Sequence, residues 1–262
     1  MYDMNNPVIT LEDLRMSYGG DDVLMGINLE IPKGQIIGYI GPNGAGKSTT
    51  IKIILGMVNG YSGRVTVLGQ DIADGKVDYK RHIGYVPETS DMYDSLTPYE
   101  YLTFLGEVYG LSYDTVNKRA KKLMNIFGIE QEYHSRISSF SKGMRQKVLL
   151  IACLIHNPDI LFLDEPLSGL DANSVLVVKE VLANLASSGK TIFYSSHIME
   201  VVEKISDRII LLSHGQVIAD GTFEELKERS SEGSLEEIFN QLTGFNSHKE
   251  IADEFVDVLN EV

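Results

Sequence analysis

The stretch SFSKGMRQKVLLIACLIHNPDILFLDEPLSGLD spans residues 139–171 and joins a Ser-x-Gly turn, a helix, a strand and a Ser-Gly-Leu-Asp turn. Ile160–Leu163 is a short, uninterrupted apolar run, the pattern of a strand covered on both faces in a parallel sheet. It delivers Asp164 and Glu165 at its C-terminal end. Ligands bind at that end of open α/β sheets, so this stretch predicts an α/β fold with a polar site beside the two acids.

A glycine-rich loop upstream has the spacing of a phosphate loop. It lies between a predicted strand, Gln35–Ile40, and a predicted helix, Thr49–Val58. Backbone N–H groups of such a loop point at phosphate oxygens, the lysine adds a positive charge, and the following serine offers a hydroxyl to Mg²⁺. The loop therefore predicts triphosphate binding. The candidate residues are Gly41, Pro42, Asn43, Gly44, Ala45, Gly46, Lys47, Ser48 and Thr49.

The two acids that follow the strand predict the reaction. We expect Asp164 to hold Mg²⁺ from the side opposite Ser48, directly or through water. Glu165 is placed to orient and deprotonate the water that attacks the γ-phosphate. The alternative is that both acids only cap the next turn. The phosphate loop favours hydrolysis over that alternative.

Composition limits the class of protein. The chain has 262 residues, of which 43% are hydrophobic, enough to bury one large domain or a core with a subdomain. Acidic residues exceed Lys and Arg by 37 to 23, which gives a net charge of −14. Nonspecific nucleic-acid binding requires clustered cations that displace counterions, so we expect no nucleic acid among the partners.

Apolar patterning and cysteine usage indicate where the protein works. The apolar run Val148–Ile155 is far shorter than the roughly 20 residues that cross a bilayer, and Met1–Pro7 is polar. We therefore expect neither a membrane span nor a secretion signal. The single cysteine, Cys153, excludes an intramolecular disulfide, fits a reducing cytoplasm and is expected in the core.

Along the chain, the patterns predict three regions. Val8–Leu14, Gly26–Ile31 and Gly63–Leu68 are expected to form strands of an antiparallel layer. Helical spacing predominates from Thr97 to Ile155, which indicates an inserted helical lobe. Further strands and helices then alternate, as in a parallel sheet. These are the strands Thr191–Tyr194 and Arg208–Leu212 and the helices Val175–Ala186 and Met199–Ile205.

The phosphate loop and residues 139–171 together resemble the ATP-binding cassette (ABC) family of ATPases, and the resemblance extends from about Val8 to Leu226. It implies a P-loop NTPase (RecA-like) parallel-sheet core with an antiparallel β layer and an inserted helical subdomain. We expect the ABC ATPase domain at residues 1–226, with the helical subdomain at about 89–155. After a Thr222/Glu225 capping-box pattern, residues 227–262 are expected to form an acidic, helical C-terminal tail.

The resemblance also implies further site residues. Tyr18 lies where family members stack an aromatic ring on adenine, although alone it would be taken for a strand-edge tyrosine. Ser141 and Gly143 correspond to the family signature, which holds the γ-phosphate of ATP bound to the opposite subunit. Asp171 ends a turn that crosses to the partner, and it also suits a helix N-cap. His197 matches the switch histidine that hydrogen-bonds the γ-phosphate.

Two departures from the family pattern stand out. Lys142 and Met144 replace a Gly and a Gln of the signature, a variant that resembles the exporter branch. Glu88 stands where most members place a Gln that touches Mg²⁺. A carboxylate also ligates Mg²⁺ through oxygen, but it adds a negative charge beside a triphosphate.

The resemblance implies the ATP-binding, ATP-hydrolysing subunit of a transporter, with ATP and Mg²⁺ as ligands. Two such subunits, identical or different, are expected to close around two ATP molecules and to drive separate transmembrane permease subunits, which dock near residues 88–101. The expected place is the cytoplasmic face of the membrane, and the expected direction is export. The alternatives are a non-transport ABC ATPase of DNA repair or translation and a regulatory cassette. No long coiled-coil insertion or second cassette is present, and Lys47, Glu165 and His197 are intact.

Overall fold

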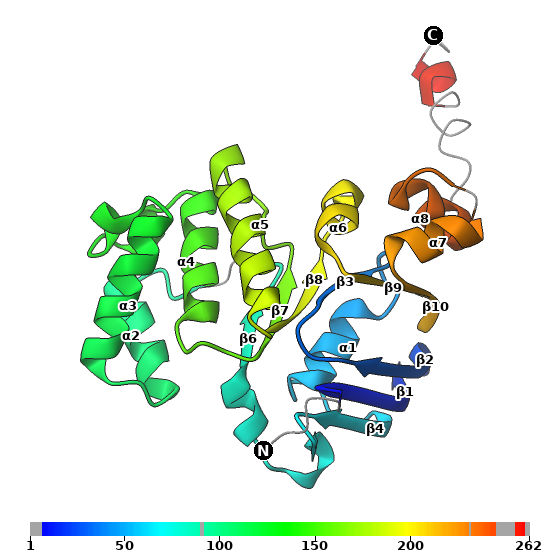
Figure 1. The fold of residues 1–262 in the computed structure, drawn as a ribbon, viewed down its shortest axis with the longest axis horizontal. Helices are drawn as coiled ribbons and strands as arrows, with labels where there is room; N and C mark the ends of the chain where they lie inside the picture. The colour runs from blue at the N-terminus through cyan, green and yellow to red at the C-terminus, as the bar shows by residue number, and fades with distance from the viewer. Residues whose placement is uncertain (1–6, 90–91, 231, 245–254, 260–262) are drawn as a thin grey trace.

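A parallel sheet forms the centre of the molecule (Figure 1). The computed structural model describes residues 7–89, 92–230, 232–244 and 255–259. Within them the sheet has the order β10-β9-β3-β8-β7-β6, and all strands but β10 run parallel. The predicted α/β class is confirmed. The strands are β3 (Ile36–Ile40), β6 (Ile83–Val86), β7 (Ile160–Asp164), β8 (Thr191–Ser195), β9 (Arg208–Ser213) and β10 (Gln216–Gly221).

The predicted antiparallel layer forms a second sheet of order β2-β1-β4-β5. Helix α1 (Lys47–Ile54) buries Ile51 and Ile53 in a cluster to which both sheets contribute. It ends earlier than the predicted Thr49–Val58, because Gly56 takes a φ of 62°, the left-handed conformation that terminates helices. The strands of the second sheet are β1 (Ile9–Tyr18), β2 (Asp21–Ile31), β4 (Ser62–Val67) and β5 (Gln70–Asp71).

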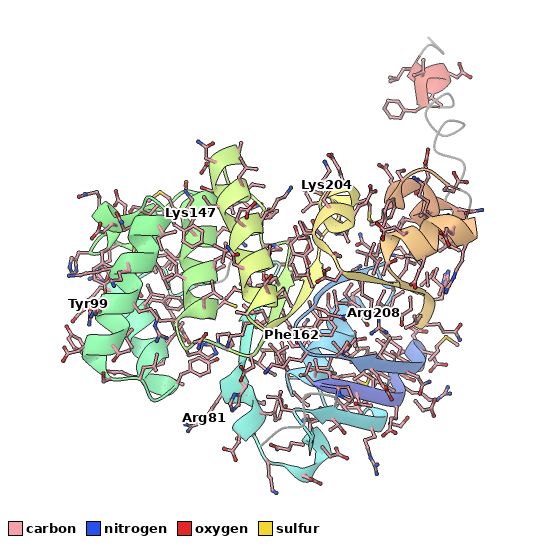
Figure 2. The ribbon with its side chains drawn as sticks, in the orientation of Figure 1. Arg81, Tyr99, Lys147, Phe162, Lys204 and Arg208 are labelled. Carbon is pink, nitrogen blue, oxygen red and sulfur yellow. The ribbon has the colours of Figure 1, made fainter. Side chains whose placement is uncertain are left out.

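Alternation along each central strand divides the core in two. Ile37 and Tyr39 of β3 face the antiparallel sheet, whereas Ile36 and Ile40 face the helices on the other side. Figure 2 labels Phe162 of β7 near the centre of the molecule, where its ring stacks on Phe193 of β8 with centroids 4.7 Å apart. Since both faces of β7 are covered, its apolar run is uninterrupted, as the sequence predicted.

The helices of the other side include an inserted lobe, found within the predicted residues 97–155. Helix α2 (Pro98–Val108) begins with a capping box between Thr97 and Glu100. Helices α3 (Tyr113–Ile126) and α4 (Lys142–Leu154) pack beside it, and α5 (Ala172–Ser187) and α6 (Met199–Ile205) follow along the sheet (Figure 1). Short 3₁₀ turns lie at Ile72–Asp74, Asp78–His82, Glu130–Glu132 and Ile137–Ser139.

The C-terminal helices differ from the expected separate tail. Thr222 and Glu225 do exchange the hydrogen bonds of a capping box, but the helix they open, α7 (Phe223–Ser230), crosses the expected boundary at residue 226. Helix α8 (Leu235–Thr243) then buries Leu235 and Ile238 in the core. Residues 235–243 are therefore part of the folded body, because apolar side chains recur among their acids at helical spacing. Residues 255–259 are also helical.

Candidate functional site

The phosphate loop joins the end of β3 to the start of α1. Gly44 and Gly46 take φ values of 79° and 104°, which a residue with a Cβ adopts only with strain. The Lys47 ammonium folds back over the loop and donates to the carbonyl oxygens of Gly41, at 2.6 Å, and Pro42, at 3.1 Å. Burial lowers the pKa of Lys47, and the nearby Asp164 and Glu88 act in the opposite direction. Its charge is thus held inside a cradle of backbone groups.

A cavity of about 180 Å³ opens above this loop. Residues from five segments distant in the sequence meet there, and they carry the hydroxyl, carboxylate, imidazole and ammonium groups of the predicted site. Hydrolysis of a triphosphate needs this combination in one place. The lining residues are Val23, Asn43, Gly44, Ala45, Gly46, Lys47, Ser48, Thr49, Glu88, Asp164, Ser195 and His197.

The two carboxylates at the end of β7 occupy different environments. Asp164 faces the cavity opposite Ser195 of β8, and burial, followed by the charges of Glu88 and Glu165, raises its pKa. Glu165 turns away from the strand with a φ of 48°. One oxygen of Glu165 accepts the backbone N–H of His197 at 2.6 Å, and the other accepts the Ser196 hydroxyl at 3.1 Å.

His197, which the sequence predicts as the switch histidine, lies beside the Glu165 carboxylate. The Nε2 atom of His197 is 3.9 Å from a Glu165 oxygen, and 61% of its side chain is exposed. The ring is therefore accessible to a ligand in the cavity. Its position follows from β8, which ends next to β7 and delivers residues 195–197 to the same edge of the sheet.

Whether these residues suit Mg²⁺ depends on their donor atoms. Ser48, Asp164 and Glu88 all present oxygen to the cavity, and oxygen is the ligand that Mg²⁺ prefers. Among the described residues, no group of three or more His, Cys, Asp or Glu side chains could hold a metal ion unaided. Mg²⁺ normally binds through one or two carboxylates together with phosphate oxygens and water, so this set fits a metal that arrives with its nucleotide.

The signature residues lie outside this cavity. Ser141 caps α4 by accepting the Met144 N–H, and a Cβ at Gly143 would collide with the Gly169 carbonyl of the Ser168–Asp171 turn. Asp171 caps α5 through Ser174, and Lys147, labelled in Figure 2, bonds it at 3.2 Å. The hydrogen bonds that the Ser174 hydroxyl and N–H donate to Asp171, together with the bond from Lys147, hold the pKa of Asp171 far below its usual range. Residues 141–143 and the Ser168–Asp171 turn thus pack closely against each other.

Tyr18 and the C-terminal helix complete the surroundings. Tyr18 ends β1 with 45% of its surface exposed, and Val23 of the adjacent β2 lines the cavity instead. A second cavity, of about 600 Å³, connects the phosphate loop and His197 to Phe239 and Asn240 of α8. The sequence analysis did not predict that Val23 lines the site or that α8 is buried beside it. The signals for α8 were the helical spacing of Leu235 and Ile238 and the capping-box pattern of Ser234 and Glu237.

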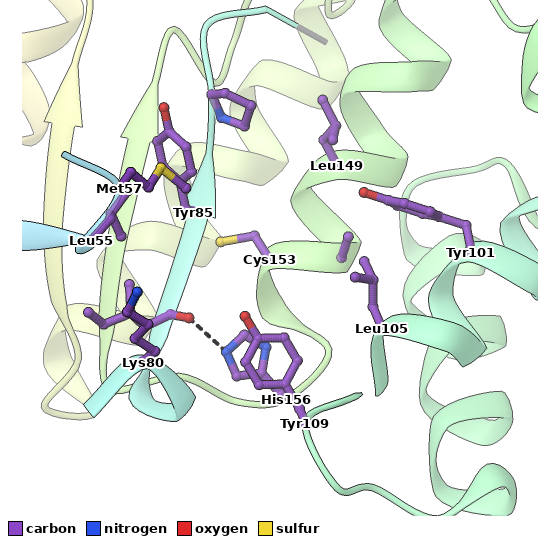
Figure 3. Close-up of a pocket in the computed structure, with 13 residues that line it drawn as sticks. Leu55, Met57, Lys80, Tyr85, Tyr101, Leu105, Tyr109, Leu149, Cys153 and His156 are labelled. Carbon is purple, nitrogen blue, oxygen red and sulfur yellow. Dashed lines mark hydrogen bonds between the residues drawn. The ribbon is translucent and has the colours of Figure 1, made fainter. Parts of the chain in front are cut away.

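An apolar groove of about 350 Å³ separates the helical lobe from the sheet (Figure 3). Tyr109 stacks on His156 with ring centroids 3.6 Å apart, and the His156 Nε2 lies 3.0 Å from the Ile83 carbonyl oxygen. Cys153 faces the groove, and burial raises the pKa of its thiol. The groove is lined by Leu55, Met57, Lys80, Ile83, Tyr85, Pro87, Tyr101, Leu105, Tyr109, Leu149, Ala152, Cys153 and His156.

Comparison with known proteins agrees with this geometry. The profile of the family described as "ABC transporter" matches residues 24–168, from β2 through the two carboxylates to the following turn. The chain belongs to the ABC transporter family. ATP-binding proteins of this family are ATPases that drive transport, so the predictions of an ATPase and of a transporter's ATP-binding subunit are confirmed. The non-transport alternatives are not favoured.

Named relatives cover most of the chain. It is 38% identical over 222 residues to "Linearmycin resistance ATP-binding protein LnrL" of Bacillus subtilis (strain 168), covering 85% of this chain and 71% of that protein. It is 39% identical over 215 residues to "ABC transporter ATP-binding protein NatA" of the same organism, covering 81% and 87%. A solved "ATP binding subunit of ABC transporter" superposes with a TM-score of 0.85 at 33% identity, covering 90% and 99%.

ABC ATP-binding subunits are peripheral to the membrane components of their transporters. In the part of this chain that the structure describes, every helix is too short or too polar to cross a bilayer.

Proposed function

We propose that two copies of the cassette, or this chain and a similar one, close around two MgATP molecules and hydrolyse them. Each site combines Lys47, Ser48, Asp164, Glu165 and His197 of one subunit with Ser141 and Gly143 of the other. Asp171 couples the two sites, and Tyr18 stacks on adenine. ATP contacts both subunits, so its binding favours the closed pair and its cleavage removes that preference.

One observation carries this proposal. The phosphate loop, Asp164 and His197 line one cavity, whereas Ser141 and Gly143 lie at the start of α4 outside it. A single chain therefore offers one half of a phosphate site and, separately, a helix N-terminus whose positive dipole end suits the other half.

Each group has a definite task in hydrolysis. Lys47 neutralises the β- and γ-phosphates, and the glycine-rich loop holds them with backbone N–H groups. Glu165 accepts a proton from the attacking water, while His197 donates a hydrogen bond to the γ-phosphate. Ser48, Asp164 and Glu88 would hold Mg²⁺, and the charge of the metal would offset the negative charge that develops on the phosphates.

The apolar groove supports docking of a transmembrane permease subunit. Tyr101 belongs to the segment expected to dock, and it lines the groove together with Tyr85, Pro87 and Leu105 (Figure 3). An apolar groove between the helical lobe and the sheet suits a short amphipathic helix. Docking there would place the cassette on the cytoplasmic face of the membrane.

Export is the proposed direction. The signature variant with Lys142 and Met144 points that way, and so do relatives whose names specify resistance or export. One is "Nod factor export ATP-binding protein I" of Ralstonia nicotianae, 34% identical over 222 residues. Nucleic acid is not an expected partner, because the net charge of −14 opposes binding to phosphate backbones.

Two variants test the shared site. Glu165→Gln should still bind ATP, slow hydrolysis by about 100-fold or more and accumulate a closed dimer, measured by phosphate release and light scattering. Ser141→Arg should abolish that ATP-dependent dimer while each subunit keeps its ATP affinity, since Ser141 caps α4 and lies outside the nucleotide cavity of its own chain. If Glu165→Gln hydrolyses ATP at the parent rate, Glu165 is not the general base. If Ser141→Arg still dimerises with ATP, the two subunits do not share the nucleotide sites.

A further inference from the structure

Two consecutive serines end β8 beside the two consecutive acids that end β7. Strand β8 runs parallel to β7, and Ser195 is the register partner of Asp164. The Ser195 side chain hydrogen-bonds the Asp164 carboxylate, and the next residue, Ser196, serves the next acid, Glu165. Both serines are only 5% exposed. Because both serines are buried beside the acids, we expect their hydroxyls to orient the two carboxylates.

The Ser196 hydroxyl occupies the centre of a small hydrogen-bond network. It donates to the second carboxylate oxygen of Glu165 at 3.1 Å and accepts the Ile198 N–H at 3.2 Å. The His197 N–H bonds the first oxygen of the same carboxylate at 2.6 Å. Glu165 is therefore held at both oxygens, once by a backbone group and once by a side chain.

The backbone of Glu165 makes such support necessary. Its φ of 48° is uncommon for a residue with a Cβ and persists only where the surroundings fix it. The backbone N–H of Glu165 donates to the Ser195 carbonyl at 2.9 Å, which holds the main chain but leaves the carboxylate free to rotate. Of the two hydrogen bonds to the carboxylate found among the described residues, the one from the Ser196 hydroxyl is removable by a side-chain substitution, whereas the other comes from the His197 backbone N–H.

The network orients the carboxylate without blocking it. A carboxylate has about four lone-pair sites, and the bonds to Ser196 and His197 occupy two of them. A lone pair remains on each oxygen to accept a proton from water. Because a small misplacement of a catalytic group can cost a large factor in rate, the orientation has a direct kinetic consequence.

We infer that Ser196 is a positioning residue for ATP hydrolysis, which fixes the Glu165 carboxylate towards the attacking water. The inference rests on the proposed role of Glu165 as the base. Ser196 does not line the nucleotide cavity, so its removal affects the rate of the chemical step rather than ATP binding. The neighbouring Ser195 differs in this respect, because it lines that cavity and bonds Asp164.

The test compares Ser196→Ala, Ser196→Thr and a matched control. We expect Ser196→Ala to lower kcat about 10-fold with KM for ATP within about 2-fold, and Ser196→Thr, which keeps the hydroxyl, to recover most of the rate. The control is Ser206→Ala, because the buried Ser206 hydroxyl has no hydrogen-bond partner among the described residues. It should match the parent. Equal rates for Ser196→Ala and Ser206→Ala overturn the inference.

A double-mutant cycle separates positioning from a general structural role. In the Glu165→Gln background the base is already absent, so Ser196→Ala should cause little further loss. The same loss in both backgrounds overturns the inference. If Ser196→Ala does not fold, Ser196→Cys, which keeps the side-chain size but donates weakly, replaces it in both comparisons. If Glu165→Gln itself hydrolyses ATP at the parent rate, the proposed role of Glu165 as base fails. This result is distinct from a failure of the Ser196 inference, which is seen in the Ser196 variants.

Discussion

The phosphate-binding edge, which is the cavity lined by the phosphate loop, Asp164 and His197, and the apolar groove are two concave regions of opposite construction. At this edge, a lysine and several carboxylates are partly buried close to one another. Burial lowers the pKa of Lys47 and raises that of Asp164, and both shifts favour the neutral form of the side chain. In the groove, apolar and aromatic side chains from several elements pack with few polar groups. The first region is arranged for a ligand at the expense of stability, whereas the second contributes to the core and keeps the apolar groove that we propose for docking.

The largest expected effect tests the ligand half of this comparison. Lys47→Ala should weaken ATP binding by about 100-fold or more, since it removes the charge held in the loop. The nucleotide-free protein should unfold at nearly the parent temperature, because Lys47 is desolvated there. Calorimetric titration with ATP and thermal unfolding measure the two quantities. A large loss of stability with intact affinity would show that the lysine serves the fold.

The next largest expected effect tests the packing around Cys153, which lines the apolar groove. Gly84 of β6 faces α4, and a Cβ there would lie 2.6 Å from the Cys153 carbonyl oxygen and 2.7 Å from its sulfur. Gly84→Ala should therefore destabilise the fold by about 2 kcal/mol, as overpacking does, which is seen as a lower unfolding midpoint in urea. Adding Cys153→Ala should recover only part of the loss, because the carbonyl remains. Complete recovery would place the strain on the sulfur alone.

A third prediction separates docking from hydrolysis. Leu105→Asp places a charge in the apolar groove and should reduce recovery of the membrane subunits on co-purification by about 10-fold, or about 1.4 kcal/mol. Phe104→Asp is the matched control, since the adjacent Phe104 is 52% exposed and does not line the groove. Both variants should keep parental ATP affinity. Equal recovery of partners by the two variants would locate the docking surface elsewhere.

The same contrast explains what the sequence could predict. The sequence predicts the phosphate loop and Asp164 because each is specified by a short local pattern at a strand end, and the structure brings both to one cavity. The groove was not identified, because Tyr85, Tyr101 and His156 come from β6, α2 and the end of α4, and only tertiary packing brings them together. The burial of α8 was missed for a related reason, since acids lie between its apolar residues and suggested a solvated helix.

The smallest effect tests whether the phosphate edge opposes stability. Burial raises the pKa of Asp164, so its charged form is less favourable in the folded protein than in the unfolded chain. Asp164→Asn should therefore raise the unfolding temperature of the nucleotide-free protein at pH 7 by roughly 2 °C, while it abolishes hydrolysis. The matched change Asp114→Asn in the exposed first turn of α3 should bring no such gain.

The gain in stability of Asp164→Asn over the parent should depend on pH. Between the ordinary Asp pKa of about 4 and the raised folded value, the folded protein binds the proton more readily, so stability falls as pH rises. The advantage of Asp164→Asn should be complete above the folded pKa, should narrow as the pH falls towards about 4, and should vanish well below that pH, where both states of the parent carry a neutral carboxyl. Unfolding curves of both proteins from pH 8 downwards measure the difference. An advantage that stays constant with pH would show that removal of the charge is not its cause, and the contrast between the two regions would then rest on Lys47 alone.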